Sequence, residues 1–394
     1  MSSVYSVPSV VKGFSPGDHE HVDLLGSSSL LQSDFYFCNA LPRLHLSPSL
    51  LHHPFMCNWR QEFPGRWPRF GVPNEPAVGS MGRRFARVLC ALTWVSAILA
   101  TPLLSRADIV TDVRTSLAQN AIPVADAQLR DYKALHGPTP EYIEALSWMA
   151  RSFASNQQWD LASQYATETR TLAEQQLAKR KFDAEPHLPT ALGAAYEVLA
   201  QSLADKGQQA AAVRLLRTAL IKYASTSIAP RLQKNLNLLS LVGHPAPPLQ
   251  STQYLGPKPP TLASLKGSPV LLFFWAHWCV DCKAEVPIIA RLRQEFSPQG
   301  LVVIGPTQYY GYAAYGNDAT PEAERAYIEA VRQRYYSSLL DMPVPLSKQN
   351  FNLYGASTTP TLVVLNRAGA VSLYHPGAMS YDDLRSALQK VLAR

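Results

Sequence analysis

Two cysteines, Cys279 and Cys282, are the residues of this chain best placed to do chemistry. The run before them, residues 270–275, is aliphatic and aromatic and predicts a buried strand, while the residues after them predict a helix that begins at the pair. Cysteines three residues apart at such a junction suit reversible disulfide formation. The positive end of the helix dipole stabilises a thiolate, so we expect Cys279 to be an exposed nucleophile and Cys282 a more buried partner that closes the ring.

The start of the chain carries an export signal in an unusual place. Residues 1–80 are rich in Pro, Ser and His, and Met81 then opens a stretch with three arginines, an apolar run and small residues at Ser105 and Ala107. This order is typical of a secretory signal peptide. It predicts a signal peptide over 81–107, translation from Met81, and a spurious or disordered extension over 1–80. An uncleaved membrane anchor over residues 88–104 is the alternative, and either predicts a periplasmic or otherwise extracytoplasmic protein.

The remaining cysteines support a catalytic pair. Of the five cysteines, Cys38, Cys57 and Cys90 precede the predicted cleavage site, and the spacing of the first two matches no zinc pattern. A mature exported protein would therefore hold Cys279 and Cys282 alone, which favours catalysis over a structural framework. We predict no metal and no cofactor besides this redox-active disulfide.

Length and charge set broad limits on the rest of the protein. A chain of 394 residues is long enough for two domains with appendages. The net charge of +7 is mild for this length and forms no basic stripe in the sequence. We therefore expect no nucleic-acid partner, and the oligomeric state stays open.

Residues 108–241 form the first predicted domain and are patterned for helices. Apolar residues recur every three or four positions in two similar units, each with a polar turn between two helices. The units resemble tetratricopeptide hairpins, but Ala162 and Ala212, at matching places, lie 50 residues apart, whereas that family repeats about every 34 residues. We expect a longer helix or insert near residues 170–185. The hairpins either bind a partner protein through a concave face or only pack against the rest of the chain.

Residues 242–394 form the second predicted domain, in which strands alternate with helices as in an α/β sheet. Helix starts are predicted at Thr320-Pro321 and at Ser380, from capping residues followed by acidic first turns. The helix after Pro321 is expected to bury Ile328, Val331 and Tyr335. The predicted elements, besides the strand and helix around the cysteines, are strands over 301–305, 361–365 and 370–374, a turn over 366–369, and a closing helix from Tyr381.

The order of these elements and the segment FWAHWCVDC resemble the thioredoxin superfamily, and within it the exported TlpA/ResA-like thiol-disulfide oxidoreductases. The motifs that carry the resemblance continue with Lys283, Glu285, Pro287 and the distant pair Thr359-Pro360. The resemblance implies a central mixed sheet flanked by helices and a cis-proline at Pro360 beside the cysteines. It also implies that the backbone of Thr359 pairs with a substrate strand and that Trp278 shields the site.

Two positions depart from the family pattern. Thioredoxins carry a buried aspartate on the strand before the cysteines, and Phe273 stands there in this chain. Glu285 is the nearest replacement for that proton acceptor, unless it is an ordinary solvated residue on a helix surface. Asp281 lies between the cysteines, where its charge opposes a thiolate on Cys279 and raises the pKa of that thiol. We therefore predict a reductant, with a potential below about −150 mV.

A tyrosine-rich loop follows the strand predicted over 301–305. Residues 307–318 include Tyr309, Tyr310 and Tyr312, and loops at the C-terminal ends of such strands lie near the site. These tyrosines either form a docking rim for a partner or pack on themselves as a surface loop.

The sequence thus predicts an exported enzyme that reduces protein disulfides through Cys279 and Cys282. The resemblance suggests a membrane thiol-reducing relay as electron donor and the thiols of apocytochrome c as one substrate. A peroxidase of the peroxiredoxin type is an alternative, but it needs Thr or Ser at the position of Ala276. A copper chaperone would need a CxxxC motif with a partnering histidine, and although His277 is adjacent to the motif, Cys279 and Cys282 have the narrower CxxC spacing. A helical-repeat scaffold with a vestigial redox domain is the non-enzymatic alternative.

Overall fold

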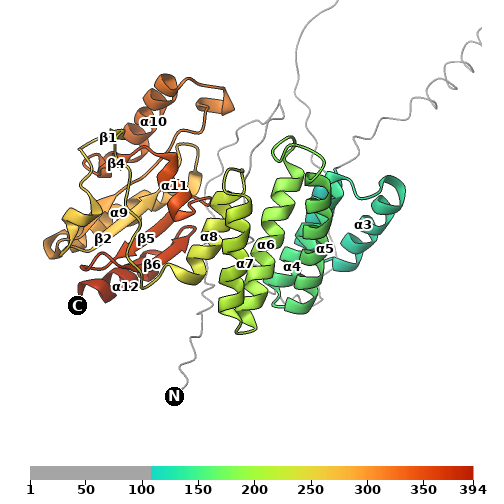
Figure 1. Ribbon diagram of the computed structural model, residues 1–394. Coiled ribbons are helices and arrows are strands. Elements are labelled where there is room, and N and C mark those ends of the chain that lie inside the picture. The colour runs from blue at the N-terminus through green and yellow to red at the C-terminus, as the bar shows by residue number, and fades with distance from the viewer. Residues whose placement is uncertain (1–107, 394) are drawn as a thin grey trace, which may run out of the picture. The chain divides into compact units, whose positions relative to one another are not determined.

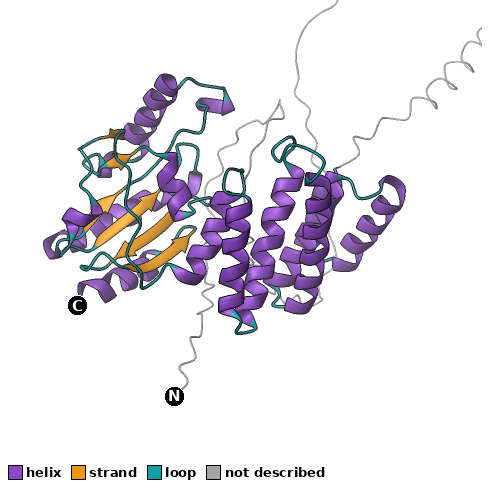
Figure 2. Cartoon of the chain, in the orientation of Figure 1, coloured by secondary structure: helices purple, strands orange, loops and turns teal. Residues whose placement is uncertain are grey.

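The computed structural model describes residues 108–393, shown in colour in Figure 1. The predictions for 1–80, for the signal peptide or anchor and for Cys38, Cys57 and Cys90 lie outside these residues. Within residues 108–393, no helix combines the length and the apolar character needed to cross a bilayer. The fold class is confirmed, because a helical region is followed by an α/β region with a mixed sheet (Figure 2).

Antiparallel hairpins build the helical region. The helices are α2 (Ile109–Ala118), α3 (Ile122–His136), α4 (Pro140–Ser155), α5 (Trp159–Leu177), α6 (His187–Asp205), α7 (Gln209–Lys222) and α8 (Ala229–Ser240). Small residues such as Ala162 and Ala212 are fully buried where neighbouring helices meet. Of the longer helix or insert expected near residues 170–185, the longer helix is confirmed, because α5 has 19 residues where its counterpart α7 has 14.

A four-stranded sheet organises the α/β region. Its strands are β2 (Val270–Phe274), β3 (Val302–Ile304), β5 (Thr361–Leu365) and β6 (Val371–Pro376), and the helices beside it are α9 (Val280–Phe296), α11 (Lys348–Tyr354) and α12 (Tyr381–Leu392). The strand order is β3-β2-β5-β6, with β2 parallel to β3 and antiparallel to β5. Successive residues of β2 point to opposite faces, so Phe273 joins a core with α9 and α12 and Phe274 joins a second core with α11.

A smaller part covers one end of this sheet. It contains the antiparallel pair β1 (Tyr254–Leu255) and β4 (Val344–Pro345) and the helix α10 (Pro321–Tyr335). Short 3-10 turns lie at Leu262–Leu265, Ser297–Gln299, Ala314–Gly316 and Ser337–Leu339. The hydroxyl of Thr320 caps α10 by accepting the N–H of Ala323, as its sequence predicts.

The expectation that Tyr335 is buried is wrong. Its side chain is 41% exposed, and the cationic groups of Lys283 and Arg334 lie over its ring. The next residue, Tyr336, is fully buried instead and packs on Trp275. The helix ends at Tyr335, so the chain leaves the helical period and turns Tyr336 inward.

The last helix of the helical region packs closely on the α/β region. Gly355 ends α11 in the left-handed conformation, with a φ of 59°. A Cβ at that position would lie 2.2 Å from the backbone nitrogen of Lys234 on α8. The side-chain amide of Asn237, also on α8, donates to the carbonyl oxygen of Leu353 at 3.4 Å. Glycine is therefore required both by the backbone conformation and by the contact with α8.

Candidate active site

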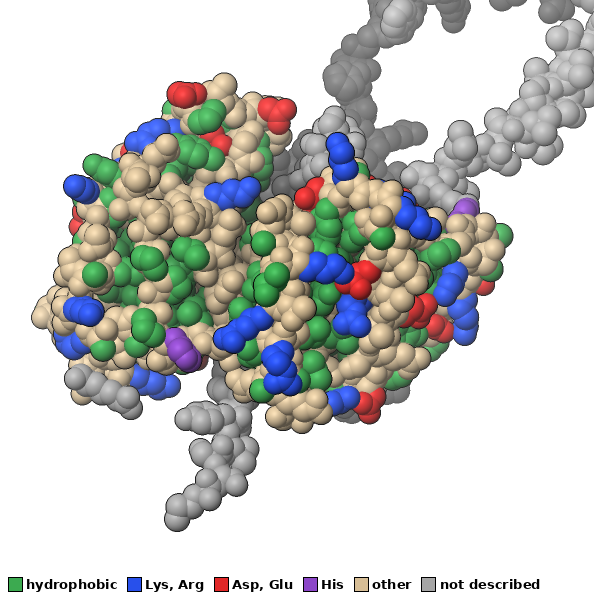
Figure 3. All heavy atoms as spheres, viewed as in Figure 1, with side chains coloured by type: hydrophobic (Ala, Val, Ile, Leu, Met, Phe, Trp, Pro, Cys, Tyr) green, Lys and Arg blue, Asp and Glu red, His purple; other side chains and the backbone are tan. Residues whose placement is uncertain are grey.

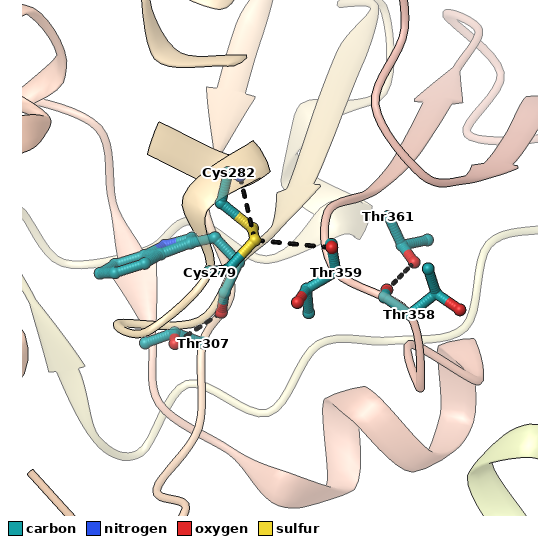
Figure 4. The surroundings of a disulfide bond; sticks show 7 residues. Cys279, Cys282, Thr307, Thr358, Thr359 and Thr361 are labelled. Atoms are coloured by element: carbon teal, nitrogen blue, oxygen red, sulfur yellow. Dashed lines mark hydrogen bonds between the residues drawn. A yellow bond between two sulfur atoms is a disulfide. The ribbon is translucent and has the colours of Figure 1, made fainter. Parts of the chain in front are cut away.

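A disulfide joins Cys279 and Cys282 at the N-terminus of α9 (Figure 4). Cys279 is the N-cap residue, and its Sγ accepts the backbone N–H of Cys282 at 3.0 Å. The same N–H is available to a thiolate when the pair is reduced, which together with the helix dipole favours ionisation of Cys279. The cysteine pair thus lies at the helix N-terminus, the position expected to favour a thiolate on Cys279.

Cys279 is less accessible than its sequence suggests. We expected an exposed nucleophile, but in the disulfide its side chain is 3% exposed, while that of Cys282 is fully buried. The ring directs Sγ of Cys279 inward, toward the loop that carries Thr359. The sulfur of Cys279 therefore contacts a segment 80 residues later in the sequence.

The peptide bond between Thr359 and Pro360 is cis, in agreement with the resemblance. The carbonyl oxygen of Thr359 lies 3.5 Å from Sγ of Cys279, and Figure 4 shows the two facing one another. The loop enters β5 directly, and the hydroxyl of Thr361 donates to the carbonyl oxygen of Thr358 at 2.6 Å. In the dithiol form, the S–H of Cys279 can donate to the Thr359 carbonyl.

Glu285 is a buried residue and not a solvated one. Its side chain is 2% exposed and lies one helical turn after Cys282 on the inner face of α9. One carboxyl oxygen accepts the backbone N–H of Met379 at 3.3 Å. Burial raises the pKa of Glu285 to about 7, and the charge of the exposed Asp281 adds to the increase. Phe273, where thioredoxins have an aspartate, is fully buried and brings no titratable group.

Aromatic residues form a wall beside the cysteines. Trp278, directly before Cys279, is 37% exposed, and the ring of Tyr310 meets it edge-on at 5.6 Å. Tyr312 packs edge-on against His277, and Tyr309 packs on the core that includes the cysteines. Of the three tyrosines singled out in the sequence, Tyr310 is thus the one in contact with Trp278.

The structure adds Glu324 to the site, a residue that the sequence did not indicate, and places it beside His277. His277 and Glu324 are both buried, with Nε2 of the imidazole 3.3 Å from a carboxyl oxygen, although not aligned for a hydrogen bond. Burial lowers the pKa of His277, and the nearby carboxyl group of Glu324 opposes that effect. In the sequence, Glu324 is an ordinary acidic residue in the first turn of a helix. No local pattern marks it as buried.

Comparisons with known proteins cover the α/β region. A family model described as the AhpC/TSA family matches residues 242–308. The thioredoxin-like protein YneN of Bacillus subtilis is 27% identical over 129 residues, which are 32% of this chain and 68% of that protein. The thiol-disulfide oxidoreductase ResA of Oceanobacillus iheyensis is 28% identical over 163 residues, 40% of this chain and 77% of that protein. A thiol:disulfide interchange protein of the thioredoxin family from Chlorobium tepidum has a solved structure with a TM-score of 0.29, 22% identical, covering 38% of this chain and 96% of that one.

Proposed function

We propose that this protein is an exported thiol-disulfide oxidoreductase of the TlpA/ResA-like kind that reduces protein disulfides, a proposal supported by the similarity of its α/β region to YneN and ResA. The observation that carries the proposal is the placement of Cys279 at the N-cap of α9, with the Thr359 carbonyl 3.5 Å from its sulfur. The sulfur that attacks the substrate therefore contacts the Thr359 backbone, which is proposed to pair with a substrate strand.

The reaction proceeds in two thiol-disulfide exchanges. The thiolate of Cys279 attacks one sulfur of the substrate disulfide, and the other substrate sulfur leaves as a thiolate. Cys282 then attacks Sγ of Cys279, which releases the second substrate thiolate and forms the Cys279–Cys282 disulfide. The substrate gains two electrons and the protein loses two, so an external dithiol must reduce the protein before the next turnover.

Glu285 serves as the proton acceptor of Cys282 in the second exchange. A thiol must lose its proton before it attacks, and a carboxyl group with a pKa of about 7 is suited to accept one near neutral pH. Glu285 lies on the same buried face of α9 as Cys282. It would take the role that an aspartate at the position of Phe273 has in thioredoxins.

The partners follow from the compartment. Export is supported by the signal-peptide pattern over 81–107, and a membrane thiol-reducing relay is the proposed electron donor. The substrates are protein disulfides, and apocytochrome c is one candidate. Tyr309, Tyr310 and Tyr312 are proposed to dock the substrate, and the helical hairpins to bind a partner protein. On the face shown in Figure 3, Lys and Arg side chains lie scattered and form no single stripe.

A reduction assay with two cysteine variants tests the proposal. The fully reduced chain should reduce the disulfides of insulin, and Cys279→Ser should abolish this activity. Cys282→Ser should instead accumulate a mixed disulfide between Cys279 and the substrate, visible by mass and released by dithiothreitol. Insulin reduction by Cys279→Ser at the wild-type rate would refute the role of the cysteine pair.

The match to the AhpC/TSA family makes a peroxidase the second candidate. In that case Cys279 would be oxidised by a peroxide, yet the Thr or Ser that such a cysteine needs three residues earlier is replaced by Ala276 in this chain. Consumption of hydrogen peroxide by the reduced chain at a rate above that of free dithiothreitol would favour the peroxidase over the reductase.

A further inference from the structure

Glu324 is buried at a helix end where acidic residues are usually solvated. Its side chain is 1% exposed, and its two carboxyl oxygens accept the backbone N–H groups of Tyr310 at 2.6 Å and Gly311 at 2.9 Å. Glu322, in the same turn of α10, is exposed. A buried carboxyl group is unfavourable unless it is hydrogen-bonded, so the two bonds hold the loop at Tyr310 against α10.

The loop held in this way reaches the residues directly before the cysteines. The ring of Tyr310 packs edge-on against His277 at 5.4 Å and against Trp278 at 5.6 Å. His277 in turn lies 3.3 Å from the carboxyl group of Glu324. Glu324 therefore contacts both the loop backbone and His277, in the segment that leads into Cys279. The ring of Tyr310 packs against that same segment.

We propose that Glu324 is a positioning residue that fixes Tyr310 against Trp278 and so holds a preformed wall for protein substrates beside Cys279. The inference rests on the proposed reductase function. A protein chain that passes through the site must lie along this wall, because Trp278 is the exposed neighbour of the buried nucleophile. A small disulfide needs access to the sulfur of Cys279 but little contact with the wall. Glu324 therefore affects recognition of protein disulfides and leaves the sulfur chemistry unchanged.

Glu324→Gln is the informative change, since it keeps the volume of the side chain. One carboxyl oxygen becomes an NH₂ group, which faces a backbone N–H and cannot accept from it. Loss of one hydrogen bond of this kind should raise KM for a protein disulfide by about threefold to tenfold. The value of kcat, and the rate with a small disulfide, should stay within about twofold of the wild type because the cysteines are untouched.

The experiment compares the full chain in its reduced form as wild type, Glu324→Gln and Glu322→Gln, with insulin and with glutathione disulfide as substrates. Glu322→Gln removes an exposed charge from the same helix turn and should leave both substrates unaffected. Hydrogen exchange supplies a second measurement. The backbone amides of Tyr310 and Gly311 should lose protection in Glu324→Gln, while those of β5 keep theirs.

Tyr310→Leu provides a variant in which Glu324 is intact and the aromatic wall is removed. It should raise KM for insulin as Glu324→Gln does. An unchanged KM for insulin in Glu324→Gln, or an equal loss of rate with both substrates, would overturn the positioning role. A wild-type chain that reduces neither substrate would instead refute the proposed function itself, so the two failures are distinguishable.

Discussion

Glu285 follows Cys282 by one turn of α9, and both side chains are buried on the same face of the helix. The buried carboxyl group of Glu285 accepts one hydrogen bond, from the backbone N–H of Met379 at 3.3 Å. The carboxyl group is therefore poorly compensated when it is charged, which is the reason that its pKa is raised to about 7.

Glu285 should make the stability of the protein depend on pH. Between its ordinary pKa of 4.5 and about 7, the folded chain keeps a proton that the unfolded chain has released. The resulting stabilisation is complete below pH 4.5 and is lost as the pH rises through 7. Glu285→Gln removes the buried charge and should raise the free energy of unfolding at pH 8 by up to about 3 kcal/mol. Urea unfolding of the oxidised wild type and of Glu285→Gln at pH 5 and pH 8 measures this difference in the free energy of unfolding.

Glu322→Gln is the matched control for that measurement, because it makes the same substitution at an exposed carboxylate that is not near Glu285. It should change the free energy of unfolding at pH 8 by less than about 0.5 kcal/mol. An equal pH dependence in Glu285→Gln and the wild type would show that Glu285 titrates normally.

Glu285→Gln should also slow the second exchange of the reaction. Without the carboxylate, Cys282 must lose its proton to water, so release of the second substrate thiol at pH 7 should fall by about 10-fold to 100-fold. The first exchange, carried out by Cys279, should be unaffected. Stopped-flow measurement of the two thiols released by an activated disulfide separates the steps, and equal slowing of both would contradict the assignment.

Asp281 should keep the reduction potential low. Its charge near the N-terminus of α9 opposes the thiolate of Cys279 and so destabilises the reduced form. Asp281→Asn should raise the midpoint potential by about 10 to 30 mV, and the wild type should lie below about −150 mV. Equilibrium titration against glutathione measures both values. A potential that falls on substitution would reverse the assigned sign.

Gly355→Ala should destabilise the chain more than an ordinary glycine substitution. The left-handed conformation alone disfavours alanine by about 1 to 2 kcal/mol. At Gly355 the new Cβ would also lie 2.2 Å from the backbone of Lys234, so α8 or α11 must shift. Gly369→Ala is the control, because Gly369 has a φ of 80° but no atom within 4 Å of its Cβ position. The unfolding temperature should fall further for Gly355→Ala than for Gly369→Ala. Equal decreases would mean that α8 can shift to accept the new Cβ without an energetic cost.

The sequence predicted those elements whose signals are local and long enough to detect. Strands such as β2 and β5 are continuous apolar runs, and α10 begins at a cap and a proline, so they could be placed within a residue or two. The two-residue strands β1 and β4 and the seven-residue α11 are too short to show a period, and they were missed.

The details of the site escaped prediction where they depend on distant segments. The buried Cys279 contacts the carbonyl oxygen of Thr359, 80 residues later, and the buried carboxyl group of Glu324 accepts the backbone N–H of Tyr310. The burial of Tyr335 was predicted wrongly because the apolar period was carried into the last residue of α10, where the helix ends and the next residue, Tyr336, is the one that turns inward. For Glu285 the sequence left two interpretations open, and the burial excludes the one in which it is an ordinary solvated residue.

The contact at Gly355 makes α8 a shared element of two regions. Its buried side chains Arg231 and Lys234 face Glu197 of α6, while its backbone leaves no space at the end of α11, only five residues before Pro360. We expect a displacement of α8 to shift the end of α11 and, through it, the segment that leads to Pro360. A protein bound to the helical hairpins would then affect that segment without touching either sulfur.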